Sequence, residues 1–301
     1  MNNVKSLRTS IDVSNYLSPL DEEVYVVESI FEHGFNIRKI STQAKQDWIY
    51  LSAIDPLKRS VMGVQLTNDE AFQTIMANLR LGERLHLKGK HWRVYSRPTM
   101  LEIELEAIHC YDCHLPRGVI HLADIQASGL VSVLEESRLL EQSAFYQLPS
   151  LKSLYQEWLE ESEATPLLLD FTLVSNLLRK LIGNGLGLTP SGDDFLQGMM
   201  VMEAMMAQED QGMVRIDQEV KKLLSYYTTS QVSLNYYDAL FAGYANQAWV
   251  QLAHALIHYE VSQIPLFLKG IENYGHTSGK DMLLGAKMYI KLRNDLEGFN
   301  E

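Results

Sequence analysis

The chain contains little cysteine and no long apolar run. With only Cys110 and Cys113 among 301 residues, a disulfide framework is excluded. No apolar stretch approaches the ~18 residues of a membrane span, and residues 1–18 lack the apolar segment of a signal peptide. Positive charge is also scarce: 26 Lys and Arg against 38 Asp and Glu leave a net charge of −12, which disfavours nucleic acid and anionic membranes as partners. These absences predict a cytoplasmic protein.

The composition that remains is that of a globular protein, with 46% hydrophobic and 21% charged residues. Short apolar segments between about residues 23 and 125 predict strands. They include a hairpin over 85–95 that turns at 88–90, and a period of two over 102–107. A helix is predicted over 72–81. We therefore expect a β-rich domain, compatible with a barrel, over residues 1–132.

After about Ser132 the hydrophobic period becomes helical. Helices are predicted over 151–161, 167–182, 193–208, 216–227, 233–258, 265–274 and 280–296. The methionines between 199 and 206 fit the core of such a domain. The fold class is therefore α+β, with the β-rich domain followed by an α-helical domain over residues 133–301.

An internal repeat lies in the helical half. Residues 191–198 (SGDDFLQG) and 278–285 (SGKDMLLG) are identical at five of eight positions, at an offset of 278 − 191 = 87 residues. A Gly-x-Thr sequence precedes each copy. The repeat predicts two pseudo-equivalent motifs, each a Gly-rich loop leading into a helix. We expect the two helices to cross near Gly198 and Gly285, with both N-termini facing one cavity.

Each copy also fits the Ser-x-x-Asp capping box, through Ser191 with Asp194 and through Ser278 with Asp281. A glycine follows each serine and would leave the first amides of the helix open to an anion. A purely structural interpretation remains, in which the serines only cap and the glycines only allow close packing.

The two copies differ at the third position of the motif, which is Asp193 in the first and Lys280 in the second. Helix capping does not require a particular residue at this position. Lys280 is expected to hold an anionic group, while Asp193 acts as a general base, orients a nitrogen donor or ligates a metal. An Asp193–Lys280 ion pair between the helices is the alternative. A substrate with both carboxylate and N–H groups suits this pair better than bare phosphate.

Two further segments carry candidate chemistry. Cys110, Cys113 and His114 match the haem-attachment spacing, but no export signal is present and a zinc site lacks its second ligand pair. We interpret the segment as a strand end and loop, and expect no cofactor and no metal. The hydroxyl-rich turn at 228–233 predicts a helix N-cap, and its hydroxyls become substrate contacts if it lies near the paired loops.

The motifs at 185–198 and 275–285 resemble the AllH-like family, formerly a domain of unknown function. The resemblance implies a subunit of oxamate carbamoyltransferase in allantoin (purine) catabolism, alongside AllG-like and FdrA-like subunits. That enzyme converts oxalurate and phosphate into oxamate and carbamoyl phosphate. The alternative is a non-catalytic subunit that binds a small anion or serves assembly, with the chemistry in a partner chain.

For a carbamoyl transfer we expect Asp193 and Lys280 to be catalytic, and preorganised donors to stabilise the oxyanion. The residues expected to bind substrate share the two motifs: Thr189, Ser191, Gly192, Asp194, His276, Thr277, Ser278, Gly279 and Asp281.

Overall fold

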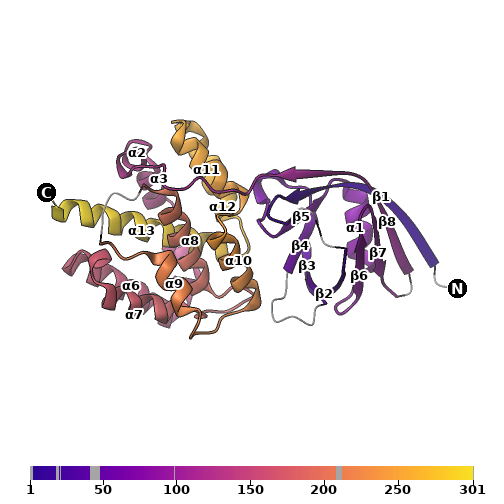
Figure 1. The fold of residues 1–301 in the computed structure, drawn as a ribbon, viewed down its shortest axis with the longest axis horizontal. Helices are drawn as coiled ribbons and strands as arrows, with labels where there is room; N and C mark the ends of the chain where they lie inside the picture. Colours follow the sequence, from indigo (N-terminus) through magenta and orange to yellow (C-terminus); the bar gives the residue numbers. More distant parts are fainter. Residues whose placement is uncertain are drawn as a thin grey trace. The chain divides into compact units, whose positions relative to one another are not determined.

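The chain forms two compact units, Met1–His114 and Leu115–Glu301. The computed structural model describes residues 3–17, 20, 22–40, 48–97, 99–207 and 212–300; its elements are labelled in Figure 1. The helical unit starts at Leu115, earlier than residue 133, and two of the four short helices before its first long helix, those over 122–127 and 130–136, begin before that residue. These short helices had not been predicted from the sequence.

The N-terminal unit is a closed β-barrel, in agreement with the prediction of a β-rich, barrel-like domain from the pattern of short apolar segments. Around the barrel the order is β1-β5-β4-β3-β2-β6-β7-β8, and a parallel pairing of β1 with β8 closes it. Closure removes the unpaired edges that an open sheet would expose. The strands are β1 (Asn3–Ser14), β2 (Val24–Phe31), β3 (Gly34–Lys39), β4 (Trp48–Ala53), β5 (Gly63–Leu66), β6 (Arg84–Lys88), β7 (His91–Tyr95) and β8 (Thr99–Tyr111).

Alternating side chains fill the barrel. On β8, Leu101, Ile103 and Leu105 are buried, while Glu104 between them is exposed. Helix α1 (Asp69–Asn78) begins at Asn68, whose side chain accepts the Ala71 amide at 3.1 Å. The hairpin and this helix confirm the predictions. Strand β1 was not predicted, since its polar residues become a strand only by pairing with distant β5 and β8.

Among its described residues the second unit contains helices and no strand, apart from an isolated β-bridge between Ile120 and Met206. Its helices are α2 (Leu122–Ala127), α3 (Leu130–Glu136), α4 (Leu139–Gln142), α5 (Ala144–Gln147), α6 (Pro149–Ala164), α7 (Phe171–Leu181), α8 (Ser191–Met205), α9 (Ile216–Leu223), α10 (Gln231–Phe241), α11 (Gln247–Ile257), α12 (Ile264–Glu272) and α13 (Ser278–Asn300). The single helix predicted over 233–258 is wrong. It is divided into α10 and α11 at Gly243, whose φ of 93° is left-handed and ends the first helix.

Helices α8 and α13 form the centre of this unit. Helix α8 is buried on nearly all sides, and its methionines lie in the main apolar core, as predicted.

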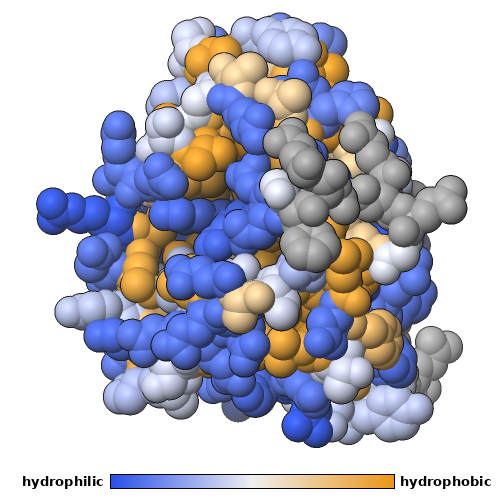
Figure 2. Space-filling model, turned by 90° about the vertical axis from the view of Figure 1, so that its left-hand side faces the viewer, coloured by the Kyte–Doolittle hydropathy of each residue, from blue (hydrophilic) through white to orange (hydrophobic). Residues whose placement is uncertain are grey.

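Hydrophilic side chains cover most of the face shown in Figure 2, with apolar patches between them. No helix within the described ranges is long and apolar enough to cross a membrane.

Candidate functional site

Helices α8 and α13 meet at two glycines. A Cβ on Gly198 would lie 1.8 Å from the carbonyl oxygen of Met282, and a Cβ on Gly285 would lie 1.9 Å from that of Phe195. Met282 is the counterpart of Phe195 in the repeat, since 195 + 87 = 282. The contact is therefore reciprocal, and the predicted crossing of two equivalent helices at these glycines is confirmed.

Both helices begin one residue earlier than the capping box requires. Helix α8 starts at Ser191 itself, after Pro190, and the Asp194 amide donates to the Pro190 carbonyl at 3.1 Å. In α13, which starts at Ser278, the Asp281 amide donates in the same way to the Thr277 carbonyl at 2.9 Å. The capping boxes predicted for the two serines are wrong. Because the serines lie inside the first turn, their hydroxyls are available to the other helix.

The Asp194 carboxylate belongs to a hydroxyl cluster that joins the two copies. Thr189 Oγ1 donates to Asp194 Oδ2 at 3.0 Å and lies 3.1 Å from Ser278 Oγ, at the start of the other helix. Ser278 is also a hydrogen-bond partner of the Asp194 carboxylate. One aspartate of α8 is thus held by a serine of α13.

Asp281 repeats this arrangement in the opposite direction. Its Oδ1 accepts the backbone amide of Ala144 at 3.0 Å, at the start of α5. The hydroxyls of Ser191 and Thr277 lie near the carboxylate and oppose the rise of its pKa, while Oδ2 has no hydrogen-bond partner among the described residues. Each motif therefore places its aspartate near the serine of the other copy and near its own threonine.

Burial raises the pKa of both aspartates. The pKa of Asp194 rises well above its ordinary value, an effect opposed by hydrogen bonds from Ser278 and Thr189 and reinforced by the neighbouring charge of Asp281. The pKa of Asp281 rises to about 7 for the same main reason. Neither carboxyl group has an ion-pair partner in the described part of the chain, so both hold protons more tightly than exposed aspartates.

Asp193 is fully buried. Its Oδ1 accepts the Tyr237 hydroxyl at 3.0 Å and the Gly183 amide at 3.2 Å, and its Oδ2 accepts the Thr229 hydroxyl. Burial raises its pKa, and these hydrogen bonds, led by that from Thr229, oppose the rise. The carboxylate therefore fastens the glycine loop and α10 to the start of α8. The hydroxyl-rich turn does lie beside the paired loops, through Thr229.

Lys280 lies on the first turn of α13 and is partly exposed. Its Nζ is 3.5 Å from the carbonyl oxygen of His276. The ion pair with Asp193 considered as an alternative is absent, both residues being within the described ranges. The ammonium therefore has no carboxylate partner there, which suits a group that meets a soluble anion.

The glycines that follow the two serines serve packing. The Gly192 amide donates to the Asn184 carbonyl, and the Gly279 amide to the Tyr274 carbonyl, each at 2.8 Å. A Cβ on either glycine would come within 2.1 Å of a backbone carbonyl oxygen. The expectation of open amides is wrong here, because the preceding chain approaches closely enough to use them.

Several partners of the buried carboxylates were not predicted from the sequence, among them the Tyr237 hydroxyl and the backbone amides of Gly183 and Ala144. Tyr237 lies two turns into the helix that follows the hydroxyl-rich turn, and that position was the only available signal. The sequence contains no signal for the Ala144 amide, because a backbone donor is not tied to any residue type.

The cysteine segment stands at the end of β8, followed by a loop, as predicted. Cys110 is exposed, while burial raises the pKa of the Cys113 thiol to about 12. Among the residues with described positions, no cluster of three or more His, Cys, Asp or Glu side chains is arranged to hold a metal ion.

The protein thus consists of a β-barrel unit and a helical unit that is built on a duplicated loop–helix motif. Residues 181–290 match the family described as oxamate carbamoyltransferase subunit AllH, and this segment holds both copies of the motif. The resemblance seen in the sequence is confirmed over these residues. No curated protein and no solved structure matches the chain.

Proposed function

We propose that this protein is a cytoplasmic subunit of an oxamate carbamoyltransferase, and that the starts of α8 and α13 bind its small anionic substrate. The observation that carries the proposal is the family match, because residues 181–290 include both motif copies. The proposed reaction converts oxalurate and phosphate into oxamate and carbamoyl phosphate in allantoin (purine) catabolism. AllG-like and FdrA-like chains are the proposed partner subunits.

The hydroxyl cluster and the lysine suit such a substrate. Thr189 donates its proton to Asp194, so its remaining lone pairs can accept an amide N–H of oxalurate or oxamate. Lys280 supplies a positive charge for the carboxylate or phosphate group. Carboxylate and amide on one small molecule then meet complementary groups on the first turn of α13 and the loop before α8.

Asp193 is proposed to position the site. Its bonds with the Gly183 amide and the Tyr237 hydroxyl hold the loop that carries Thr189. A direct role as general base would require substrate to reach a carboxylate that is fully buried. In this proposal, therefore, Asp193 acts through the loop.

A non-catalytic subunit that binds the anion is the second candidate. It is favoured by the burial of Asp193, Asp194 and Asp281, each 3% exposed or less, and by the occupied amides of the two motif glycines. In this version the chain holds the substrate, and a partner subunit supplies the reacting groups.

A thermal-shift experiment tests the binding site. The purified chain is heated with oxamate, oxalurate, carbamoyl phosphate or phosphate, and a ligand at ~100 times its dissociation constant should stabilise it by ~2.7 kcal/mol. Lys280→Gln should abolish the shift. Lys269→Gln should keep it, because Lys269 is a 60% exposed surface lysine on α12. Absence of a shift with all four compounds, or its survival in Lys280→Gln, would contradict the proposed site.

Turnover separates the two candidate functions. Oxalurate and phosphate are supplied to the chain alone and to the chain with its partner subunits, and carbamoyl phosphate is measured. Product from the isolated chain supports the catalytic version. Product only with the partners, together with ligand binding by the isolated chain, supports the binding version.

A further inference from the structure

A cavity of about 390 Å³ lies in the helical unit, between α13, α6 and the segment 135–141. One face of α13 forms a wall, because Leu284, Lys287, Met288 and Lys291 follow the i, i+3, i+4, i+7 spacing. The volume falls in the range of small-molecule sites. None of the residues proposed above to bind substrate lines the cavity, so it would be a second site.

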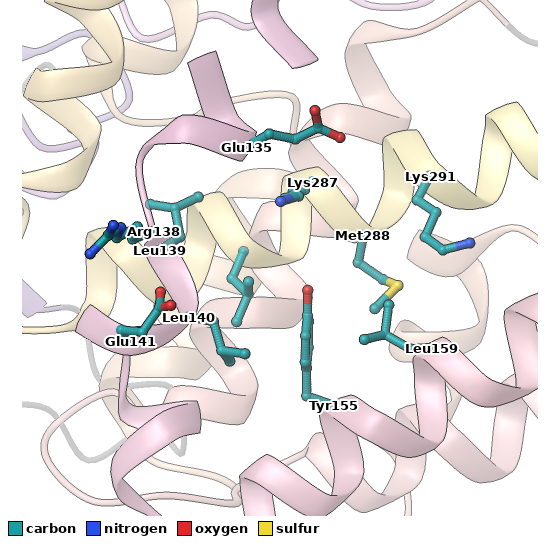
Figure 3. A pocket seen from close by; sticks show the side chains of 11 residues that line it. Glu135, Arg138, Leu139, Leu140, Glu141, Tyr155, Leu159, Lys287, Met288 and Lys291 are labelled. Carbon is teal, nitrogen blue, oxygen red and sulfur yellow. The ribbon is translucent and has the colours of Figure 1, made fainter. Parts of the chain in front are cut away.

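Much of the lining is apolar. Leu139 and Leu140 of α4, Leu159 of α6 and Met288 of α13 contribute aliphatic side chains. The side chain of Tyr155 projects from α6 into the cavity, and its hydroxyl points toward α13 (Figure 3). An apolar chain or ring of a ligand could be buried against these side chains, which favours binding.

The polar groups that face this apolar lining include an uncommitted cation and an uncommitted donor. Lys287 forms no ion pair within the described ranges, whereas Lys291 is held by Asp295 at 2.7 Å. The Tyr155 hydroxyl has no hydrogen-bond partner among the same residues, and burial raises its pKa to about 12. It therefore stays protonated in neutral solution and can donate a hydrogen bond to an anion.

The charges of the lining favour an anion over a cation. Because Asp295 neutralises Lys291, the remaining lining charges are Arg138 and Lys287 against Glu135 and Glu141. Arg138 and the two carboxylates are exposed to solvent, whereas Lys287 is half-buried, so the charge set deepest in the cavity is positive. Arg138 has a left-handed backbone, with φ of 48°, at the start of α4. A non-glycine residue held in this region costs free energy and is common at binding sites.

We propose that this cavity binds a small amphipathic anion, a carboxylate or a phosphate monoester with an apolar chain or ring. The anionic group meets the Lys287 ammonium and the Tyr155 hydroxyl. The apolar part lies against Leu140, Leu159 and Met288. The proposal does not depend on the carbamoyltransferase function, because its residues differ from those of that site.

Calorimetric titration of the full chain with hexanoate, hexyl phosphate and 1-hexanol tests the proposal. At least one of the two anions should bind about tenfold more tightly than hexanol, since the alcohol lacks the charge-assisted hydrogen bond. The tighter of the two identifies the preferred head group. Equal binding of hexanol, or no binding of either anion, would overturn the proposal.

Two variants assign the binding to this cavity. Lys287→Gln should weaken the anion about tenfold or more, while the matched surface change Lys269→Gln should leave it unchanged. If Lys287→Gln fails to fold, Leu159→Trp fills the cavity from its half-buried rim instead and should abolish anion binding. The oxamate shift of Leu159→Trp should persist, which separates this site from the proposed substrate site. Undiminished anion binding in a folded variant would refute the assignment.

Discussion

Replacing Gly198 by alanine would place a methyl carbon 1.8 Å from the carbonyl oxygen of Met282. Cβ contacts shorter than 3.0 Å are essentially never seen in proteins, so the two backbones must separate by at least 3.0 − 1.8 = 1.2 Å at this point. The obstacle is backbone, which cannot swing aside as a flexible side chain would. Overpacking of a core lowers the free energy of unfolding by ~1–3 kcal/mol and occasionally by more. We expect Gly198→Ala to lower it by ~3 kcal/mol or more.

The prediction extends to the equivalent position of the repeat. Gly285→Ala places its methyl carbon 1.9 Å from the Phe195 carbonyl and should destabilise the protein by a similar amount. The double variant should cost less than the sum, because the first substitution already forces the helices apart and makes room for the second.

Urea denaturation of each variant measures the free energy of unfolding. Gly298→Ala is the matched control, since it lies on the same helix α13 with no atom within 4 Å of the added Cβ. It should be neutral or stabilise by up to ~1 kcal/mol, as alanine is the better helix former. A loss below ~0.5 kcal/mol in Gly198→Ala, or strict additivity in the double variant, would refute the reciprocal crossing.

Two further predictions concern the buried carboxylates. Asp193 accepts three hydrogen bonds, and Asp193→Asn replaces one of its acceptor oxygens by an NH₂ donor. The substitution should lower the free energy of unfolding, measured by urea denaturation, by ~1–3 kcal/mol. A decrease smaller than ~0.5 kcal/mol would contradict the role of Asp193 in holding the glycine loop and α10 to α8. Burial raises the pKa of Asp281 from 3.8 to about 7, so the folded state binds this proton more tightly than the unfolded chain. Its stabilising contribution is complete below about pH 4 and lost as pH rises through about 7. Asp281→Asn should therefore flatten the fall in stability between about pH 5 and about pH 7.5, and an unchanged slope would contradict the raised pKa.

Local pattern was sufficient for much of the architecture. The period of two over β8 and the helical period after residue 132 depend only on neighbouring residues, so they were readable without tertiary information. Strand β1 was not, since its partners lie more than 50 residues away along the chain. Gly243 likewise divides a continuous helical pattern, because an isolated glycine can be tolerated in a helix or end it.

At the site, the repeat, the crossing glycines and the identity of the polar residues could all be predicted from the sequence. Which of these groups come together depends on how the helices pack: the serine of each copy lies near the aspartate of the other, and Asp193 accepts a hydrogen bond from Tyr237 instead of pairing with Lys280. A buried carboxylate accepts hydrogen bonds from whichever donors the packing brings near it. Those donors come from segments far apart in the chain. One of them, the Ala144 amide, is a backbone group, which the residue type does not identify as a partner.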